Sequence, residues 1–371
     1  MAAAEKTLSQ RELNRATLAR QHLLERTDMS SLDMVEHLAG MQAQVPHGPY
    51  AGLFARIDGF DPAEASGLLS ERKLIRGWFM RGTIHLISSR DSLRWWPLTE
   101  RVLVRTFKGT TFSKELGSAP IDEVLQAARQ MVEVEPLLRS EIGRRLGERW
   151  PDAVASSLGF AAGYRLPLVQ VTPRGLWGQT GQARLTTIEA WLGDDLATDP
   201  PIEDLVLRYL GALGPATVKD FQNWSGLTRI AEVVDRLRPQ LATFRAEDGR
   251  ELFDLPDAPR PGADVPSPPR FLPEYDNLLL GHADRSRLAD KDAKGATLFT
   301  ASGPFQGTLL VDGLLSGSWR LHREASAVEL HVRHFKPLPR PVRSEVEAEG
   351  RLLVGLIAAG ADDCRVRFSR I

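Results

Sequence analysis

The chain has 371 residues, with 47 Lys and Arg against 48 Asp and Glu, which gives a formal net charge of −1. At roughly 150 residues per domain this length predicts two to three domains, and the balanced charge excludes a global positive field, so any site for nucleic acid must be a local patch. A single cysteine, Cys364, excludes an internal disulfide, a Cys-rich zinc site and a four-thiolate iron–sulfur cluster, and it fits the reducing cytosol. The N-terminus lacks the apolar core of a signal peptide, and the longest apolar run, near Leu352–Ala359, is too short to span a bilayer, so we expect a soluble cytoplasmic protein.

Three consecutive stretches, residues 1–115, 116–198 and 199–257, predict one order of elements, in which helices are followed by a β-hairpin. The last stretch is the clearest, because helical spacing marks three helices and an Asp-Gly turn marks the hairpin. Its predicted elements are helices over Ile202–Leu213, Thr217–Trp224 and Leu227–Leu237, with the turn at Asp248-Gly249. Three helices and a hairpin form the winged-helix plan, a relative of the helix-turn-helix.

The two earlier stretches follow the same order with weaker signals. In the middle stretch the predicted helices cover Ile121–Val132, Leu137–Trp150 and Ala153–Tyr164, and the hairpin strands cover Leu168–Val171 and Ala183–Thr187. In the first stretch Ser9 and Glu12 form a capping box ahead of Leu13–Leu24, Asp61-Pro62 starts another helix, and Leu74–Phe79 pairs with Thr83–Ile87. The sequence therefore predicts three tandem winged-helix units.

A proline-rich segment follows the third unit and predicts a domain boundary. Seven prolines between Pro256 and Pro273 exclude both a helix and a central strand there. Beyond it, apolar and β-branched runs alternate with Gly-rich turns, so residues 258–371 are predicted to form a β-rich C-terminal domain. The fold class expected for the whole chain is α+β.

One segment of the first unit carries a local excess of positive charge. Between Arg72 and Lys108 there are nine Lys and Arg against Asp91 and Glu100, interleaved with tryptophans. Such a segment is suited to neutralising phosphates while aromatic rings stack on bases. The alternative is a solvated basic face above a tryptophan core.

Common catalytic signatures are absent from the sequence. It has no phosphate-binding loop ending in Lys-Ser/Thr, no dinucleotide fingerprint, no His-Glu-x-x-His and no Gly-x-Ser-x-Gly. His331 and His334 lie three apart in a β-period segment, where they point to opposite faces and do not share a metal ion. We therefore expect neither a metal nor another cofactor.

The segment Gly40-Met-Gln42-Ala-Gln44-Val-Pro46 is more unusual. Residues two apart do not share a helical face, so Gln42 and Gln44 converge only if the helix ends there, and Pro46 supplies a reason for that end. Both carboxamides would then line one cavity. The alternative is that they are ordinary polar residues at the surface of a helix C-terminus.

At these residues the chain resembles the AlkZ-type winged-helix DNA glycosylases, whose relatives include the YcaQ group. The resemblance covers nearly the whole chain. The matching pieces are Leu13-Asn14-Arg15, Gly40-Met-Gln42-Ala-Gln44, Met80-Arg81-Gly82-Thr83-Ile-His85, Gly214-Pro215-Ala216-Thr217, Leu272-Pro-Glu274-Tyr-Asp276-Asn277, Gly281-His282 and Leu310-Val-Asp312-Gly.

The resemblance implies three tandem winged-helix units followed by a β-rich, barrel-like C-terminal domain. It also implies that Gln42 and Gln44 are the catalytic residues of a monofunctional DNA glycosylase, which hydrolyses the N-glycosidic bond of bulky N7-alkylated purines and leaves an abasic site. Unhooking of interstrand crosslinks and resistance to DNA-alkylating natural products belong to the same expectation. The expected partner is double-stranded DNA with alkylated purines, bound by a monomer.

Three residues near the predicted hairpin of the first unit, Arg76, Arg81 and His85, are expected to bind phosphates that flank the lesion. A structural role for His85 remains an equal alternative. Glu274 and Asp276 are read as residues that tether a loop. Two other classes of function stay open at this stage, a non-catalytic winged-helix regulator or lesion sensor, and a protein whose hairpins bind other proteins.

Overall fold

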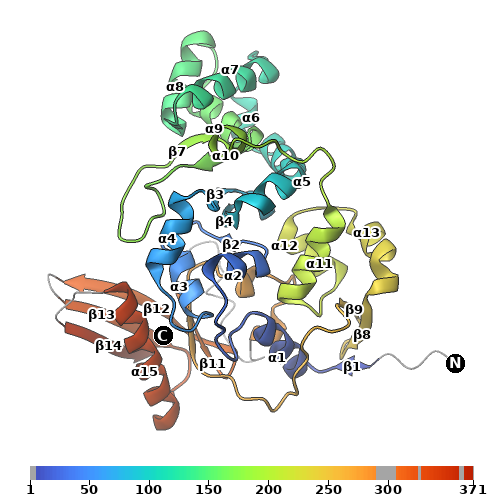
Figure 1. Cartoon of the computed structure of the whole chain (residues 1–371), viewed down its shortest axis with the longest axis vertical. Helices are drawn as coiled ribbons and strands as arrows, with labels where there is room; N and C mark the ends of the chain where they lie inside the picture. The colour runs from blue at the N-terminus through green and yellow to red at the C-terminus, as the bar shows by residue number, and fades with distance from the viewer. Residues whose placement is uncertain (1–5, 290–305, 325–326, 359–362, 371) are drawn as a thin grey trace.

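The computed structural model describes residues 6–289, 306–324, 327–358 and 363–370, and its architecture is α+β (Figure 1). The strands of the described residues form sheets with the orders β2-β4-β3-β6-β7-β5, β1-β8-β9 and β10-β11-β12-β13-β14. None of these sheets closes into a barrel in the described part of the chain. No helix there is long and apolar enough to cross a membrane.

The first two predicted units share one sheet. Their elements are β1 (Thr7–Leu8), α1 (Gln10–Arg20), α2 (Ser31–His37), β2 (Met41–Gln42), α3 (Gly48–Phe54), α4 (Pro62–Ser70), β3 (Leu74–Trp78), η1 (Met80–Gly82), β4 (Ile84–Ser88), α5 (Ser89–Lys108), α6 (Thr111–Lys114), α7 (Ile121–Val134), β5 (Leu137–Leu138), α8 (Arg139–Arg149), α9 (Ala155–Arg165), β6 (Leu168–Gln170), β7 (Arg184–Thr187) and α10 (Ile188–Leu192). The hairpin β3–β4 joins the hairpin β6–β7 through the pairs Arg76–Gln170 and Gly77–Val169. The two regions are therefore one continuous body at this sheet.

Local sequence signals place most of these elements. Ser9 and Glu12 form the predicted capping box, since the Ser9 side chain accepts from the Glu12 backbone N–H while the Glu12 carboxylate accepts from Ser9 N. Asp61 caps α4 with Pro62 at its first position. The predicted hairpin of the first region is confirmed as β3 and β4.

The third region contains the predicted helices and hairpin. Its elements are α11 (Ile202–Leu213), α12 (Val218–Ser225), α13 (Ile230–Leu237), η2 (Arg238–Gln240), β8 (Ala242–Ala246) and β9 (Glu251–Asp254). Gly249, with a φ of 83°, makes the turn between the two strands. Strand β1 adds to this hairpin in parallel with β8. A strand that the sequence assigns to the first unit therefore lies in the sheet of the third region.

The C-terminal region is an open sheet with a long helix, and the expected barrel-like shape is wrong. Its elements are β10 (Arg270–Leu272), α14 (Asn277–Leu280), η3 (Ser286–Leu288), β11 (Gly307–Val311), β12 (Leu314–Glu324), β13 (Ala327–His334), α15 (Arg340–Ile357) and β14 (Asp363–Arg370). Strand β14 pairs only with β13 in the described residues, so β10 and β14 are both edges. Helix α15 covers one face of this sheet, where its Gly350 lies against Leu330, Val366 and Phe271.

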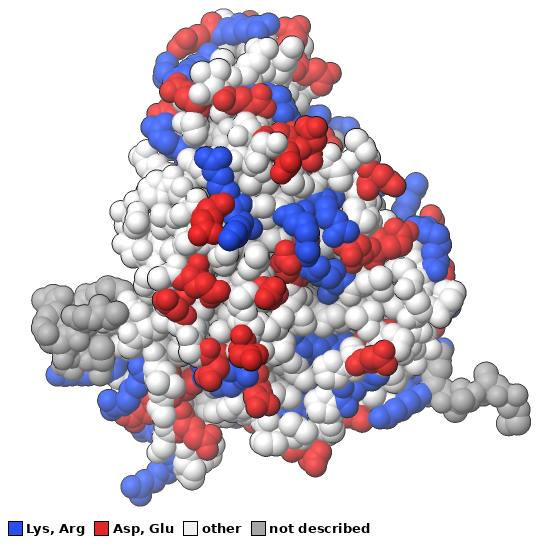
Figure 2. Space-filling model, in the orientation of Figure 1, with Lys and Arg blue, Asp and Glu red and all other residues white. Residues whose placement is uncertain are grey.

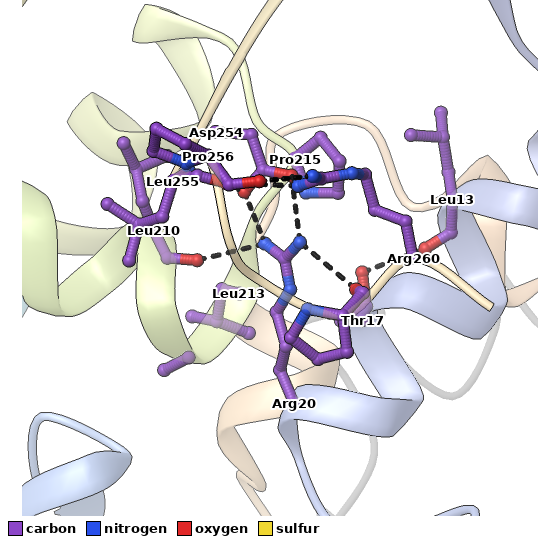
Figure 3. Close-up of polar contacts among 12 residues, drawn as sticks. Leu13, Thr17, Arg20, Leu210, Leu213, Pro215, Asp254, Leu255, Pro256 and Arg260 are labelled. Carbon is purple, nitrogen blue, oxygen red and sulfur yellow. Dashed lines mark hydrogen bonds and ion pairs between the residues drawn. The ribbon is translucent and has the colours of Figure 1, made fainter. Parts of the chain in front are cut away.

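A buried ion pair joins α1 to the third region (Figure 3). The Arg20 guanidinium makes two contacts of 2.6 and 2.8 Å with the Asp254 carboxylate, and both side chains are at most 1% exposed. Arg260, from the proline-rich segment, binds the same carboxylate at 2.6 Å, and Arg20 also donates to the Leu210 carbonyl at 3.0 Å. One carboxylate thus joins α1, β9 and the segment that leads to the C-terminal region.

We expect Asp254→Ala to destabilise the protein by roughly 3–5 kcal/mol, because it leaves the Arg20 charge buried without its partner. Arg144→Ala is the control, since the Arg144–Glu148 pair is 65% and 68% exposed and its loss changes stability by about 0.5 kcal/mol or less. Urea titration followed by circular dichroism measures both. Equal losses in the two variants would contradict the prediction.

Candidate active site

The chain turns sharply just before the two glutamines. Helix α2 ends at His37, and Ala39 and Gly40 then take positive φ values of 56° and 88°. A Cβ on Gly40 would lie 3.3 Å from the Leu86 carbonyl oxygen, so glycine suits both the conformation and the close approach. The expectation that Pro46 ends this helix is therefore wrong, because the turn comes earlier.

Gln42 lies on the short strand β2, opposite His85 of β4. The next backbone group, Ala43 N–H, donates to the Ile84 carbonyl at 2.7 Å, which continues the pairing by one bond. Gln42 therefore ends a strand and Gln44 follows at a bend two residues later, so the β3–β4 hairpin, and not a helix end, brings the two glutamines to one place. Gln42 is 7% exposed, and Gln44 is exposed.

The β3–β4 hairpin fixes the orientation of the Gln42 carboxamide. Arg81, in the turn of this hairpin, donates from Nη2 to Gln42 Oε1 at 2.7 Å and from Nη1 to the Trp224 carbonyl at the end of α12. Burial lowers the pKa of Arg81 to about 10, so its guanidinium keeps its charge at neutral pH. With its oxygen held by a cation, the carboxamide directs its NH₂ group away from Arg81.

The same hairpin holds Gln44. The Ile84 backbone N–H donates to Gln44 Oε1 at 3.1 Å. A carbonyl oxygen has two lone pairs, so each glutamine oxygen retains one acceptor position after its anchoring bond. The site therefore offers two oriented carboxamides, one buried and one at the surface, each with NH₂ donors and one remaining acceptor.

Arg76 holds the backbone around Gln44 from inside the protein. It is 2% exposed, and its guanidinium donates to the carbonyls of Ala43 at 2.7 Å and Pro46 at 3.3 Å, and to Gln170 Oε1 at 3.3 Å. Burial lowers its pKa to about 10, which leaves the cation intact at neutral pH. Arg76 therefore braces the loop in this structure, and its guanidinium is not placed for the phosphate contact that the sequence suggested.

Asn277, at the first position of α14, clamps the other side of β2. Its Oδ1 accepts from Gln42 N–H at 3.3 Å, and its Nδ2 donates to the Gly40 carbonyl at 2.5 Å. The preceding residue, Asp276, binds both Nη atoms of buried Arg56 at 2.9 and 2.8 Å. Asp276 therefore tethers the loop as predicted, whereas the role of Asn277 was missed although the residue belongs to a motif singled out in the sequence.

His85 is fully buried beside Gln42. Its Nδ1 lies 2.9 Å from the Thr83 carbonyl oxygen, and no described group forms a hydrogen bond with its Nε2. Burial, together with the Arg81 charge, lowers the pKa of His85 to about 3, so the imidazole is neutral at physiological pH. A neutral, enclosed ring fits the structural alternative better than contact with a phosphate.

The basic segment from Arg72 to Lys108 does not form one positive surface. Arg76 is buried and Arg81 half-buried, and several other cations of the segment are ion-paired, as Arg90 with Glu36 and Arg94 with Asp204. Trp95 and Trp96 are 0% and 4% exposed and belong to the core, so they are not available for stacking on bases. On the face drawn in Figure 2, Lys and Arg are interspersed with Asp and Glu.

One basic stripe of this segment does reach the surface. Arg101, Arg105 and Lys108 are exposed and spaced for one face of α5. Arg105 donates to the Gly226 carbonyl, two residues beyond the Trp224 carbonyl that Arg81 binds. This stripe therefore adjoins the Gln42 site.

The described residues contain no group of three or more His, Cys, Asp or Glu arranged to hold a metal ion.

Comparisons with known proteins identify the family of this chain. The profile of the AlkZ-like DNA glycosylases matches residues 35–355. The interstrand DNA cross-link repair glycosylase of Streptomyces sahachiroi is 24% identical over 352 residues, which cover 90% of this chain and 92% of that protein. The solved structure of Streptomyces sahachiroi DNA glycosylase AlkZ has the same fold, with a TM-score of 0.77 at 22% identity over 98% of this chain and 100% of that one. The chain belongs to the AlkZ-like DNA glycosylase family.

Proposed function

We propose that this DNA glycosylase hydrolyses the N-glycosidic bond of N7-alkylated purines, including bulky adducts and interstrand crosslinks, and leaves an abasic site. The observation that carries the proposal is the pair of carboxamides, Gln42 and Gln44, anchored through their oxygens to one hairpin. The cross-link repair function in the name of the Streptomyces relative supports the extension to crosslinks. The chain belongs to a family of enzymes, and no observation on the described residues favours a non-catalytic DNA-binding role.

The chemistry requires little beyond a positioned water. Alkylation at N7 makes the purine cationic and a good leaving group, and its glycosidic bond breaks through an oxocarbenium-like state, as in glycoside hydrolysis. A carboxamide is too weak a base to deprotonate water, but its free acceptor position orients a water proton while its NH₂ group holds a neighbouring acceptor. Gln44, exposed at the surface, is the residue we assign to contact with that water. Gln42, behind it, shapes the site.

We further propose that residues 1–115, 116–198 and 199–257 act as three winged-helix units that contact duplex DNA, with residues 258–371 as the fourth part. The third unit supports this division best, because α11, α12 and α13 are followed directly by the β8–β9 hairpin. In this arrangement Arg76, Arg81 and His85 act beneath the DNA surface and position the glutamines. Phosphates near the lesion are assigned instead to the exposed stripe on α5.

Gln44→Ala should reduce base release from duplex DNA carrying a bulky N7-alkylguanine by at least about 100-fold, while DNA affinity changes less than about twofold, because the lost group orients the nucleophile. Single-turnover assays at saturating enzyme give the rate, and fluorescence anisotropy gives the affinity. Gln126→Ala, at an exposed position of α7, is the matched control. Full activity of Gln44→Ala would rule out the assignment.

Arg81→Gln should lower the single-turnover rate at least about tenfold without altering the salt dependence of DNA binding, because Arg81 orients Gln42 rather than neutralising a phosphate. A lost phosphate contact would instead reduce the slope of log K against log salt by about 1. Arg81→Lys should recover part of the rate, since the ammonium still reaches one of the two carbonyl oxygens. A smaller slope in Arg81→Gln would favour the phosphate contact.

Unmodified purines should not be substrates, because a neutral base needs an acid to leave and the site offers carboxamides and a histidine whose pKa is lowered to about 3. The protein should also leave the DNA strand intact. Chromatography of released bases and gel analysis without heat or alkali measure both. Released adenine or guanine from undamaged duplex, or direct strand breaks, would contradict these expectations.

A further inference from the structure

A long loop of the second region reaches the part of the first region that follows the glutamines. The loop covers residues 171–183 between β6 and β7, and it extends from the second region towards α4 (Figure 1). Its Trp177 backbone N–H donates to Ser66 Oγ of α4 at 2.7 Å, and its Gly175 carbonyl accepts from the Tyr50 hydroxyl of α3 at 2.8 Å. The loop is therefore attached to the next two helices after the glutamines.

The same loop contacts the segment that carries Gln44. His47, three residues beyond Gln44, places its Nε2 3.2 Å from the Leu176 carbonyl oxygen, and its ring centroid lies 5.8 Å from that of Trp177. The Trp177 ring centroid also lies 4.7 Å from that of Tyr50. A segment of the second region therefore borders the glutamine site, and the chemistry described above does not use it.

The two segments together form an apolar rim, which consists of Val45, Pro46, Leu176 and Trp177. Val45 is next to Gln44 and is 37% exposed, and the other three side chains are half-buried. Leu176 and Trp177 also pack on the hydrophobic cluster that contains Met41 of β2. The rim is therefore held in place by the core and keeps apolar surface open to solvent beside Gln44.

Both segments of the apolar rim are almost free of charged residues. Residues 41–54 contain no Asp, Glu, Lys or Arg, and residues 171–183 contain Arg174 alone, in a chain of which 26% of the residues are charged. Arg174 donates from Nη1 to the Gly181 carbonyl of its own loop at 2.8 Å. Sites for small organic groups are lined mainly by apolar and aromatic side chains with a few oriented polar groups. The rim beside the two carboxamides matches that description and is unsuited to a phosphate.

We propose that the apolar rim binds the substituent on N7 of the alkylated purine and favours apolar or aromatic substituents over a methyl group. The inference rests on the proposed glycosylase function and adds the determinant of its substrate class. In a purine nucleoside N7 is joined to the anomeric carbon through C8 and N9, so the substituent begins beside the bond that breaks. The water held by Gln44 must lie beside the same bond, and Val45 is the next residue. A larger substituent reaches Leu176 and Trp177 and buries more apolar surface there.

The test compares two duplexes of one sequence, of which one carries 7-methylguanine and the other 7-benzylguanine at the same position. Val45→Ser removes apolar surface from the rim. Val134→Ser, at an 86% exposed position of α7, is the matched control. Single-turnover assays give the maximal rate of base release and the enzyme concentration at half of that rate, and circular dichroism verifies that the variants are folded.

We expect Val45→Ser to raise the half-saturating concentration for the benzyl duplex by roughly tenfold, the effect of losing one or two methylene groups from an apolar contact. For the methyl duplex the same value should change less than about twofold. Trp177→Leu should act in the same direction as Val45→Ser. Val45→Ile, which stays apolar and β-branched, should keep the wild-type selectivity, and Val134→Ser should change neither duplex.

Two results would overturn the proposal. If Val45→Ser weakens both duplexes equally, Val45 supports the glutamine segment and does not contact the substituent. If it weakens neither, the rim does not touch the substrate. Affinity for each duplex is also measured by anisotropy in Gln44→Ala protein with and without Val45→Ser, where no hydrolysis is needed. A wild-type protein that releases neither base would refute the proposed reaction, and the affinity difference between the two duplexes would still decide for or against the rim.

Discussion

The ion pair between Arg56 and Asp276 is the contact on which the geometry of the glutamine site depends. It is formed in the interior, with both side chains at most 1% exposed, and it fixes the loop that presents Asn277 to β2. Strand β2 has only two residues, too few to hold its own position by pairing with β4 alone. A side chain 235 positions away in the sequence therefore completes the backbone support of Gln42.

Buried arginines perform the same task throughout the molecule. Arg15, Arg20, Arg56 and Arg76 are among its largest fully buried side chains, and each binds carbonyl or carboxylate oxygens from distant segments. A guanidinium has five donors in a fixed plane, so one residue can join several chain segments at once. Hydrophobic contacts stabilise the separate cores without specifying direction, whereas these bonds fix how the regions are oriented.

The sequence predicted elements well where the signal is local, as at the Ser9–Glu12 capping box and the Asp248-Gly249 turn. It failed for α15, which begins next to prolines and contains Gly350, because its apolar face becomes evident only against the sheet that it covers. It also identified the two glutamines as a candidate site, and it did not reveal that Arg76 and Arg81 make hydrogen bonds inside the protein. A sequence does not show which arginines bind carbonyl oxygens inside the protein, because those oxygens come from segments that only the fold brings together.

The sheet shared by the first two regions has a mechanical consequence. Gln170 of β6 is bonded to Arg76, and Arg76 holds the carbonyls of Ala43 and Pro46 on either side of Gln44. The second region, which extends furthest from the rest in Figure 1, is thus connected to the glutamine loop by an unbroken series of hydrogen bonds. A displacement of that region relative to the rest of the chain would therefore act on the backbone on either side of Gln44 through two side chains, Gln170 and Arg76.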